Sequence, residues 1–177
     1  VKFFRGQEQN VLSRFYHTAK NQKLETITRV NADCPVIDPN IIDNALEKYN
    51  TNGFNIVSTS GLNYTNRTFP LGLDFEIFSI STLKKAYRHA IEDYQLEHVT
   101  PWIYENLDKL HTLRFIMDLS NLRLTLDTYE DYLLLRKIYN KLYEPNKIFL
   151  IEDVLKFLDT NPELKKINSN IVQKKIK

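Results

Sequence analysis

The stretch from Thr26 to Pro39 constrains the fold more than any other part of the chain. Residues 26–30 form a β-branched run, which is typical of a buried strand. Asp38 can cap a following helix, and Pro39 suits the first helical position because no N–H is needed there. Asp33 is therefore expected in a short strand-to-helix loop, at the sheet edge where open α/β proteins bind ligands. An aspartate that only caps its own turn fits the same position, and these residues leave both interpretations open.

Strand and helix patterns alternate through the first part of the chain. We predict helices over 8–20 and 39–51, strands over 1–6, 26–30 and 54–59, and a loop over 60–70. This alternation favours an α/β fold with a mostly parallel sheet and helices on both faces. Because the opening residues read as a strand already under way, we expect the chain to enter the fold part-way, as an N-terminally truncated version of it.

Two acidic residues share one face of a further predicted strand over 71–78. Its apolar residues alternate with Asp74 and Glu76, so the two carboxylates are expected on the side opposite the core. An ordinary half-exposed strand has the same pattern. The spacing therefore leaves a binding role and a merely solvated face as alternatives.

A second aspartate repeats the placement of Asp33. We predict helices over 81–91, 95–105, 128–142, 154–158 and 162–167, and strands over 113–117 and 122–126. Asp127 directly follows the last of these strands, and Thr128 with Asp131 forms a variant of the capping box that starts a long helix. We therefore expect Asp33 and Asp127 to meet over one edge of the sheet.

Two aspartates at strand ends are enough for a magnesium–nucleotide site, since Mg²⁺ completes its octahedron with water and substrate phosphates. The alternative is thiol chemistry, with Cys34 as nucleophile and His98 as base. The charge on the neighbouring Asp33 disfavours the thiolate and argues against it. His98, beside Glu97, fits a proton shuttle, an anion contact, a helix cap or a satisfied core residue.

Composition excludes several classes of protein. With 177 residues and 42% hydrophobic content, the chain is predicted to form a single domain over residues 1–177. A formal net charge of +2 gives no reason to expect a nucleic-acid partner. One cysteine, and apolar runs far too short to cross a bilayer, predict a soluble, cytoplasmic protein with no membrane association.

Four ordered motifs carry a family resemblance: N-A-D-C-P-V-I-D (31–38), R-T-F-P-L-G-L-D-F-E (67–76), E-H-V-T-P (97–101) and L-R-L-T-L-D-T-Y-E-D (122–131). They resemble the SpsF-like cytidylyltransferases of the spore coat polysaccharide biosynthesis type, which are related to the acylneuraminate and KDO cytidylyltransferases. Members of that family begin with a strand and a nucleotide-gripping loop of the Q-A-R-x-G-S-x-R-L-P-x-K type, which this sequence lacks. We therefore expect the C-terminal part of the family fold.

The resemblance implies a Rossmann-like nucleotide-diphosphosugar transferase fold and transfer of CMP from CTP to a sugar, with release of pyrophosphate, in surface polysaccharide or glycan biosynthesis. It implies that Asp33 and Asp127 are catalytic and hold Mg²⁺. Substrate binding is assigned to Arg67, Asp74, Glu76 and His98. Because a sheet without its first strands exposes an edge, we also expect a homodimer. The alternative is a non-catalytic remnant or interaction domain that keeps the fold without its nucleotide-binding loop.

Overall fold

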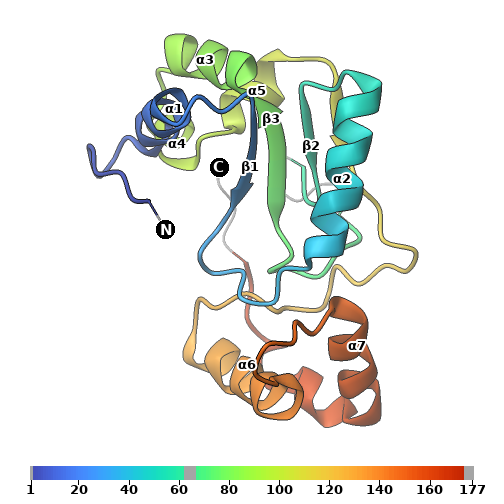
Figure 1. Cartoon of the computed structure of the whole chain (residues 1–177). Coiled ribbons are helices and arrows are strands. Elements are labelled where there is room, and N and C mark those ends of the chain that lie inside the picture. The colour runs from blue at the N-terminus through green and yellow to red at the C-terminus, as the bar shows by residue number, and fades with distance from the viewer. Residues whose placement is uncertain (1, 62–66, 174–177) are drawn as a thin grey trace.

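A computed structural model describes residues 2–61 and 67–173, and within them a four-stranded sheet forms the centre (Figure 1). Its spatial order is β1 (Thr26–Val30), β3 (Phe75–Ser79), β2 (Ile56–Ser58) and β4 (Leu110–Thr112). β3 is antiparallel to β1 and β2, whereas β2 and β4 are parallel. β1, β2 and β4 thus run in one direction and β3 in the other. The predicted α/β class is confirmed, but the expectation of a mostly parallel sheet is wrong, because two of the three strand pairings among the described residues are antiparallel.

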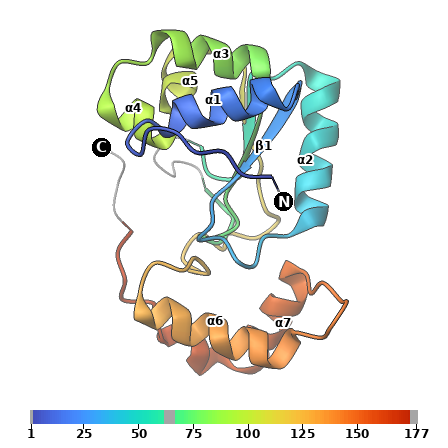
Figure 2. The same cartoon turned by 60° about the vertical axis from the view of Figure 1, so that its left-hand side comes forward.

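Helices cover both faces of this sheet (Figures 1 and 2). One side carries α1 (Val11–Asn21), α3 (Ile80–His89), α4 (Asp93–His98) and α5 (Pro101–Asn106), and the other carries α2 (Pro39–Asn52). The C-terminal α6 (Tyr129–Leu142), α7 (Ile151–Thr160) and the 3₁₀ helix η2 (Pro162–Lys166) form a layer below the sheet in Figure 1. Each helix in the described part of the chain is too short or too polar to cross a lipid bilayer.

Two hydrophobic cores lie on opposite faces of the sheet, because successive strand residues point to opposite sides. Ile27, Ile56 and Phe78 pack beneath α1, α3 and α5. On the other face, Phe75 and Ile77 pack against α2, and this second core continues into α6 and α7. Since both faces are covered, β3 is not the half-exposed strand that its alternation suggested.

Local signals correctly placed both ends of α2 and the start of α6. The Asp38 side chain accepts a hydrogen bond from the Asn40 amide at 2.9 Å, and α2 ends at Gly53 in the left-handed conformation, with φ 64°. Thr128 and Asp131 form the predicted capping box at the start of α6. Asp38 also accepts from the Ile151 amide at 3.0 Å, so one carboxylate caps α2 and fixes the start of α7.

Three predicted strands are wrong. Residues 2–6 have no strand structure, and the edge strand β4 ends at Thr112, before the predicted 113–117. Residues 122–126 make only an isolated bridge, in which Leu71 and Arg123 pair. Leu113 N still donates to the Ser58 carbonyl of β2, but Phe115 N donates to the Thr68 hydroxyl instead of the sheet, a difference that a short apolar run does not reveal. Residues 62–66 of the predicted loop lie outside the described residues.

Gly72 allows the segment 122–126 to cross close to β3. Its φ is 98°, and a Cβ at this position would lie 2.4 Å from backbone atoms of Leu124 and Thr125. The crossing is held by two backbone hydrogen bonds, from Leu71 N to Leu122 O at 2.9 Å and from Leu124 N to Leu71 O at 2.7 Å. Only glycine accommodates both the positive φ and this close approach.

Candidate active site

The candidate site begins where one face of the sheet changes from apolar to polar. The row of core residues Ile27, Phe78 and Ile56 pairs across β1, β3 and β2. Two residues further along, on the same face, the paired row is Arg29, Glu76 and Ser58, and the next alternate positions are Asn31, Asp74 and Ser60. These polar rows lie at the carboxyl ends of the parallel strands β1 and β2, the usual place for a ligand in an open α/β sheet.

A pocket of about 430 Å³ lies over these rows. Four of the six predicted site residues line it, namely Asp33, Asp74, Glu76 and His98. Arg29, Thr100, Tyr104 and Thr125 also line it, and the sequence patterns assign no role to any of these four residues. The pocket therefore brings together residues from β1, β3, the α4–α5 connection and the crossing segment.

Glu76 is the most heavily hydrogen-bonded group in the pocket wall. Its Oε2 accepts from Arg29 Nη1 at 2.7 Å, and its Oε1 accepts from the hydroxyls of Thr100 at 2.7 Å and Tyr104 at 3.0 Å. Burial, together with the adjacent charge of Glu76, raises the pKa of Tyr104 well above its usual value. Tyr104 therefore stays a neutral donor to the carboxylate.

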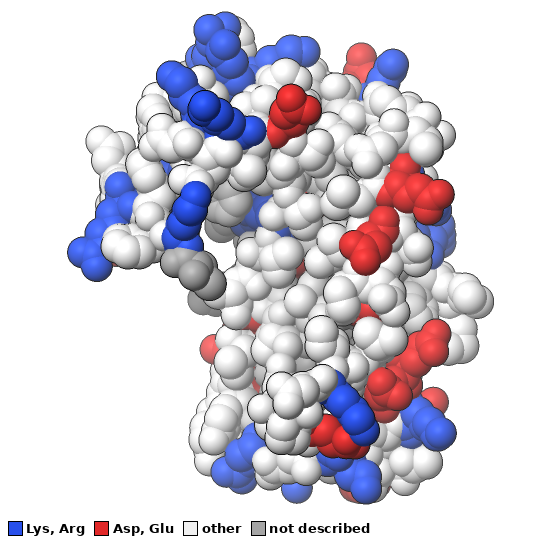
Figure 3. All heavy atoms as spheres, viewed as in Figure 1, with Lys and Arg blue, Asp and Glu red and all other residues white. Residues whose placement is uncertain are grey.

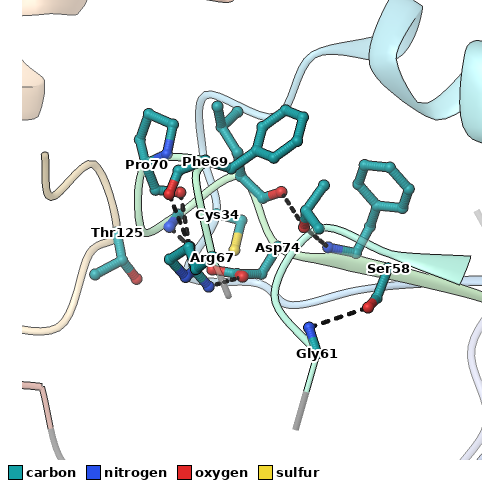
Figure 4. Close-up of polar contacts among 12 residues, drawn as sticks. Cys34, Ser58, Gly61, Arg67, Phe69, Pro70, Asp74 and Thr125 are labelled. Atoms are coloured by element: carbon teal, nitrogen blue, oxygen red, sulfur yellow. Dashed lines mark hydrogen bonds and ion pairs between the residues drawn. The ribbon is translucent and has the colours of Figure 1, made fainter. Parts of the chain in front are cut away.

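Arg67 pairs with Asp74 (Figure 4) but does not itself line the pocket. Asp74 pairs with Arg67 Nη2 through Oδ1 and accepts from the Gly72 amide at 3.0 Å through Oδ2. Arg67 is buried, and its Nη1 also donates to the Pro70 carbonyl at 2.8 Å. Arg67 thus holds the Pro70 turn and orients Asp74, which is the member of the pair that lines the pocket.

Asp33 lies where the loop after β1 meets the crossing segment. Its carbonyl accepts from the Leu126 amide at 2.9 Å and from the Thr125 hydroxyl at 3.0 Å, and its Oδ1 contacts Cys34 Sγ at 3.6 Å. Burial raises the pKa of the Cys34 thiol to about 12, and the charges of Asp74 and Asp33 act in the same direction. A thiol with this pKa is neutral near pH 7, which argues against Cys34 as a nucleophile.

Asp127 is close to this junction but is not a pocket-lining residue. Its Oδ2 accepts from Arg123 Nη2 at 2.7 Å, and its side chain is 36% exposed. Thr125 and Leu126, directly before it, bond to Asp33, so the segments carrying the two aspartates are adjacent. The approach of the two carboxylates to each other stays a prediction.

Strained backbone places His98 and Thr100 in the pocket together. Between them, the buried Val99 has a φ of 73°, and the predicted helix over 95–105 is broken there into α4 and α5. A positive φ is rare for a β-branched residue, and such strain is concentrated at functional sites. The break turns the chain so that both neighbours of Val99 line the pocket.

Asp33 and Asp127 are predicted to hold Mg²⁺, and the described residues offer few other groups to a metal ion. Within residues 2–61 and 67–173, no group of three or more His, Cys, Asp or Glu is placed to hold a metal ion. Mg²⁺ bound to phosphates needs only one or two carboxylates, with water as the other ligand. Asp33, at the pocket, and the partly exposed Asp127 fit that oxygen donor set.

Arg29 could have been found from the sequence. Arg29 lies two residues from both Ile27 and Asn31, so strand periodicity places it on the same face as these residues, the face that leads to Asp33. A charged residue within a β-branched strand was the available signal. Tyr104 had no such signal, because it reaches Glu76 from a helix 28 residues further along the chain.

Comparison with known proteins identifies the family. The cytidylyltransferase family profile matches residues 1–174, and the chain belongs to this family of nucleotidyltransferases. The chain is 38% identical to the uncharacterized protein MJ1063 of Methanocaldococcus jannaschii, over 98% of this chain and 70% of that protein. It is 30% identical to the spore coat polysaccharide biosynthesis protein SpsF of Bacillus subtilis, over 92% of this chain and 66% of SpsF.

A solved structure supports the same assignment. A cytidylyltransferase from Leptospira borgpetersenii serovar Hardjo-bovis superposes with a TM-score of 0.83 at 30% sequence identity, over 97% of this chain and 70% of that one. The predicted SpsF-like resemblance and the fold are therefore confirmed. The chain spans 66–70% of the length of the three proteins it matches.

Proposed function

We propose that this chain contains the part of an active site that binds the sugar acceptor. The enzyme transfers CMP from CTP to this sugar and releases pyrophosphate, in surface polysaccharide or glycan biosynthesis. One observation carries the proposal: Asp33, Asp74, Glu76 and His98 converge on a single pocket at the carboxyl edge of β1 and β2. Family membership supports the cytidylyl part of the reaction. The sugar acceptor and the pathway are proposed by analogy with SpsF.

In the proposed reaction, the chain's own side chains orient the sugar. Asp74, held by Arg67 and the Gly72 amide, is placed to accept hydrogen bonds from sugar hydroxyls. His98 supplies a further hydrogen-bonding group to the same pocket. Holding the acceptor oxygen of the sugar in line with the α-phosphorus of CTP lowers the entropic cost of bringing the two reactants together. Magnesium held by Asp33 and Asp127 would neutralise charge on the phosphates.

The partners of the site follow from the same proposal: CTP, Mg²⁺ and a sugar. Lys and Arg side chains lie at the top of the face shown in Figure 3 and Asp and Glu along its right side, so charges of both signs are spread over it.

We further propose a homodimer, since Val30 and Leu110 are exposed on the outer strands β1 and β4. Light scattering that reports only monomer at micromolar concentration would contradict the dimer.

The direct test is pyrophosphate release from CTP, measured with a panel of acidic and neutral sugars. Both this chain and a version with any residues its coding region adds before Val1 are assayed, with Mg²⁺ and with a chelator. We expect turnover with at least one sugar, abolished by the chelator. Absence of turnover with every nucleotide and sugar in both versions would instead support the non-catalytic alternative.

A further inference from the structure

Arg29 and Glu76, which form an ion pair in the pocket wall, have different roles in substrate binding. We infer that Arg29 binds an anionic oxygen of the substrate, and that Glu76 is a positioning residue that holds Arg29 in place. The inference rests on the proposed function, because it concerns the same pocket. It changes the assignment of Glu76, which the sequence had placed among the substrate-binding residues.

Glu76 has little capacity left for a substrate. Its residue exposure is 7%, and it accepts hydrogen bonds from Arg29, Thr100 and Tyr104. An ionised carboxylate offers about four acceptor positions, and these donors take three of them. The donors come from two separate parts of the chain, β1 and the start of α5, so they fix the carboxylate rather than leave it free to follow a ligand.

Arg29, in contrast, keeps one donor that no residue in the described part of the chain uses. Its Nη1 donates to Glu76, while its buried Nε has no hydrogen-bond partner among the described residues. The guanidinium lies over the Phe15 ring, 5.9 Å from the centroid, which restrains its plane. The side chain is 18% exposed, twice the value for the Glu76 side chain, and Arg29 lines the pocket.

A guanidinium anchored on one side and restrained in its plane is suited to a carboxylate or a phosphate, which it binds with two parallel N–H groups. Two substrates of the proposed reaction can supply such an oxygen: a sugar acid through its carboxylate, or CTP through a phosphate. The pocket chemistry is the same for both. Matched ligand pairs that differ in charge distinguish the two sources.

The test measures binding by calorimetry for two ligand pairs: N-acetylneuraminate against its methyl ester, and CTP with Mg²⁺ against cytidine. We expect wild type to prefer the charged member of at least one pair, and Arg29→Gln to reduce that preference about tenfold or more. Arg29→Lys should restore part of it, because the charge returns without the planar fork. Arg136→Gln is the matched control, since Arg136 also lies over an aromatic ring, 5.5 Å from the Tyr132 centroid, but lies outside the pocket.

The positioning role of Glu76 is tested by a double-mutant cycle. If Glu76 acts through Arg29, Glu76→Gln lowers the same preference, and adding it to Arg29→Gln costs nothing further. Tyr104→Phe, which removes one donor to Glu76 and leaves both charges, replaces Glu76→Gln in the cycle if that variant unfolds. Additive effects, an unchanged preference in Arg29→Gln, or no charge preference in wild type would each overturn the inference. If wild type releases no pyrophosphate but its preference for the charged ligand depends on Arg29, only the proposed function is contradicted.

Discussion

Two arginine–carboxylate networks in this protein use the same chemistry in different surroundings. In the pocket network, Glu76 pairs with Arg29 and accepts hydrogen bonds from the hydroxyls of Thr100 and Tyr104. In the lower network, Asp131 is fully buried and accepts from Arg123 Nε and Nη2, both at 2.8 Å, and from Asn168 at 2.8 Å. The first arginine faces a cavity, whereas the second is enclosed by protein.

The lower network joins three parts of the C-terminal region. Asp131 also accepts from the amides of residues 127 and 128, and Asn168 donates to the Arg123 carbonyl at 3.0 Å. The crossing segment, the first turn of α6 and the chain after η2 are thereby fixed together. Burial and pairing therefore do not by themselves mark a functional carboxylate. What matters is whether its arginine has a donor left and a cavity to direct it into.

The largest expected effect is on the enclosed side of the comparison. Asp131→Asn leaves Arg123 as a buried charge without its main partner, so we expect a loss of about 3–5 kcal/mol in the free energy of unfolding. Urea denaturation measures it. Glu144→Gln, which breaks the exposed pair with Lys147, is the control and should cost less than about 0.5 kcal/mol. A small loss for Asp131→Asn would mean that the lower network is not structural.

The second-largest expected effect concerns Asp33 in the pocket. Asp33→Asn should reduce pyrophosphate release about 100-fold or more, because an amide is a poor ligand for Mg²⁺, while the free energy of unfolding changes by less than about 0.5 kcal/mol. Asp43→Asn, an exposed change of the same kind on α2, is the control. If turnover ignores the chelator and survives Asp33→Asn, the metal assignment of Asp33 is wrong.

The contribution of Asp131 to the free energy of unfolding should also depend on pH. Burial alone would raise the pKa of Asp131, but hydrogen bonds from Arg123, Asn168 and the backbone outweigh it and lower the pKa to about 2. A carboxyl whose folded pKa is depressed stabilises the fold above its unfolded value and loses that contribution as pH falls from about 4 to 2. The stability gap between wild type and Asp131→Asn should therefore narrow by about 2 kcal/mol over that range, as measured by denaturation at each pH. A constant gap would contradict it.

The smallest expected effect is at Cys34. Because its thiol has a pKa of about 12, Cys34→Ala should change pyrophosphate release by less than about twofold. Alkylation by iodoacetamide at pH 8 should be correspondingly slow in the folded protein, with the unfolded protein as the reactive control. Loss of turnover in Cys34→Ala at unchanged stability would revive the thiol mechanism.

Features that depend on neighbours within a few residues could be predicted from the sequence. Asp38 with Pro39, Gly53, and the Thr128–Asp131 box set helix ends through contacts two to four residues long, and these predictions are confirmed. The position of Asp33 just after β1 followed from the same local rules. The order of the motifs along the chain was enough to indicate the family, which the comparisons confirm.

The tertiary structure alone decided which carboxylates face the pocket. Arg29 reaches Glu76 across 47 residues of sequence, and Thr100 reaches it across 24. The antiparallel register of β3 creates the first contact, and the turn at Val99 directs Thr100 into the pocket for the second. Neither follows from a local pattern, because strand pairing and helix packing are chosen by the burial of both sheet faces at once. The short apolar runs at 113–117 and 122–126 were mistaken for strands for the same reason: only their distant partners determine whether they join the sheet.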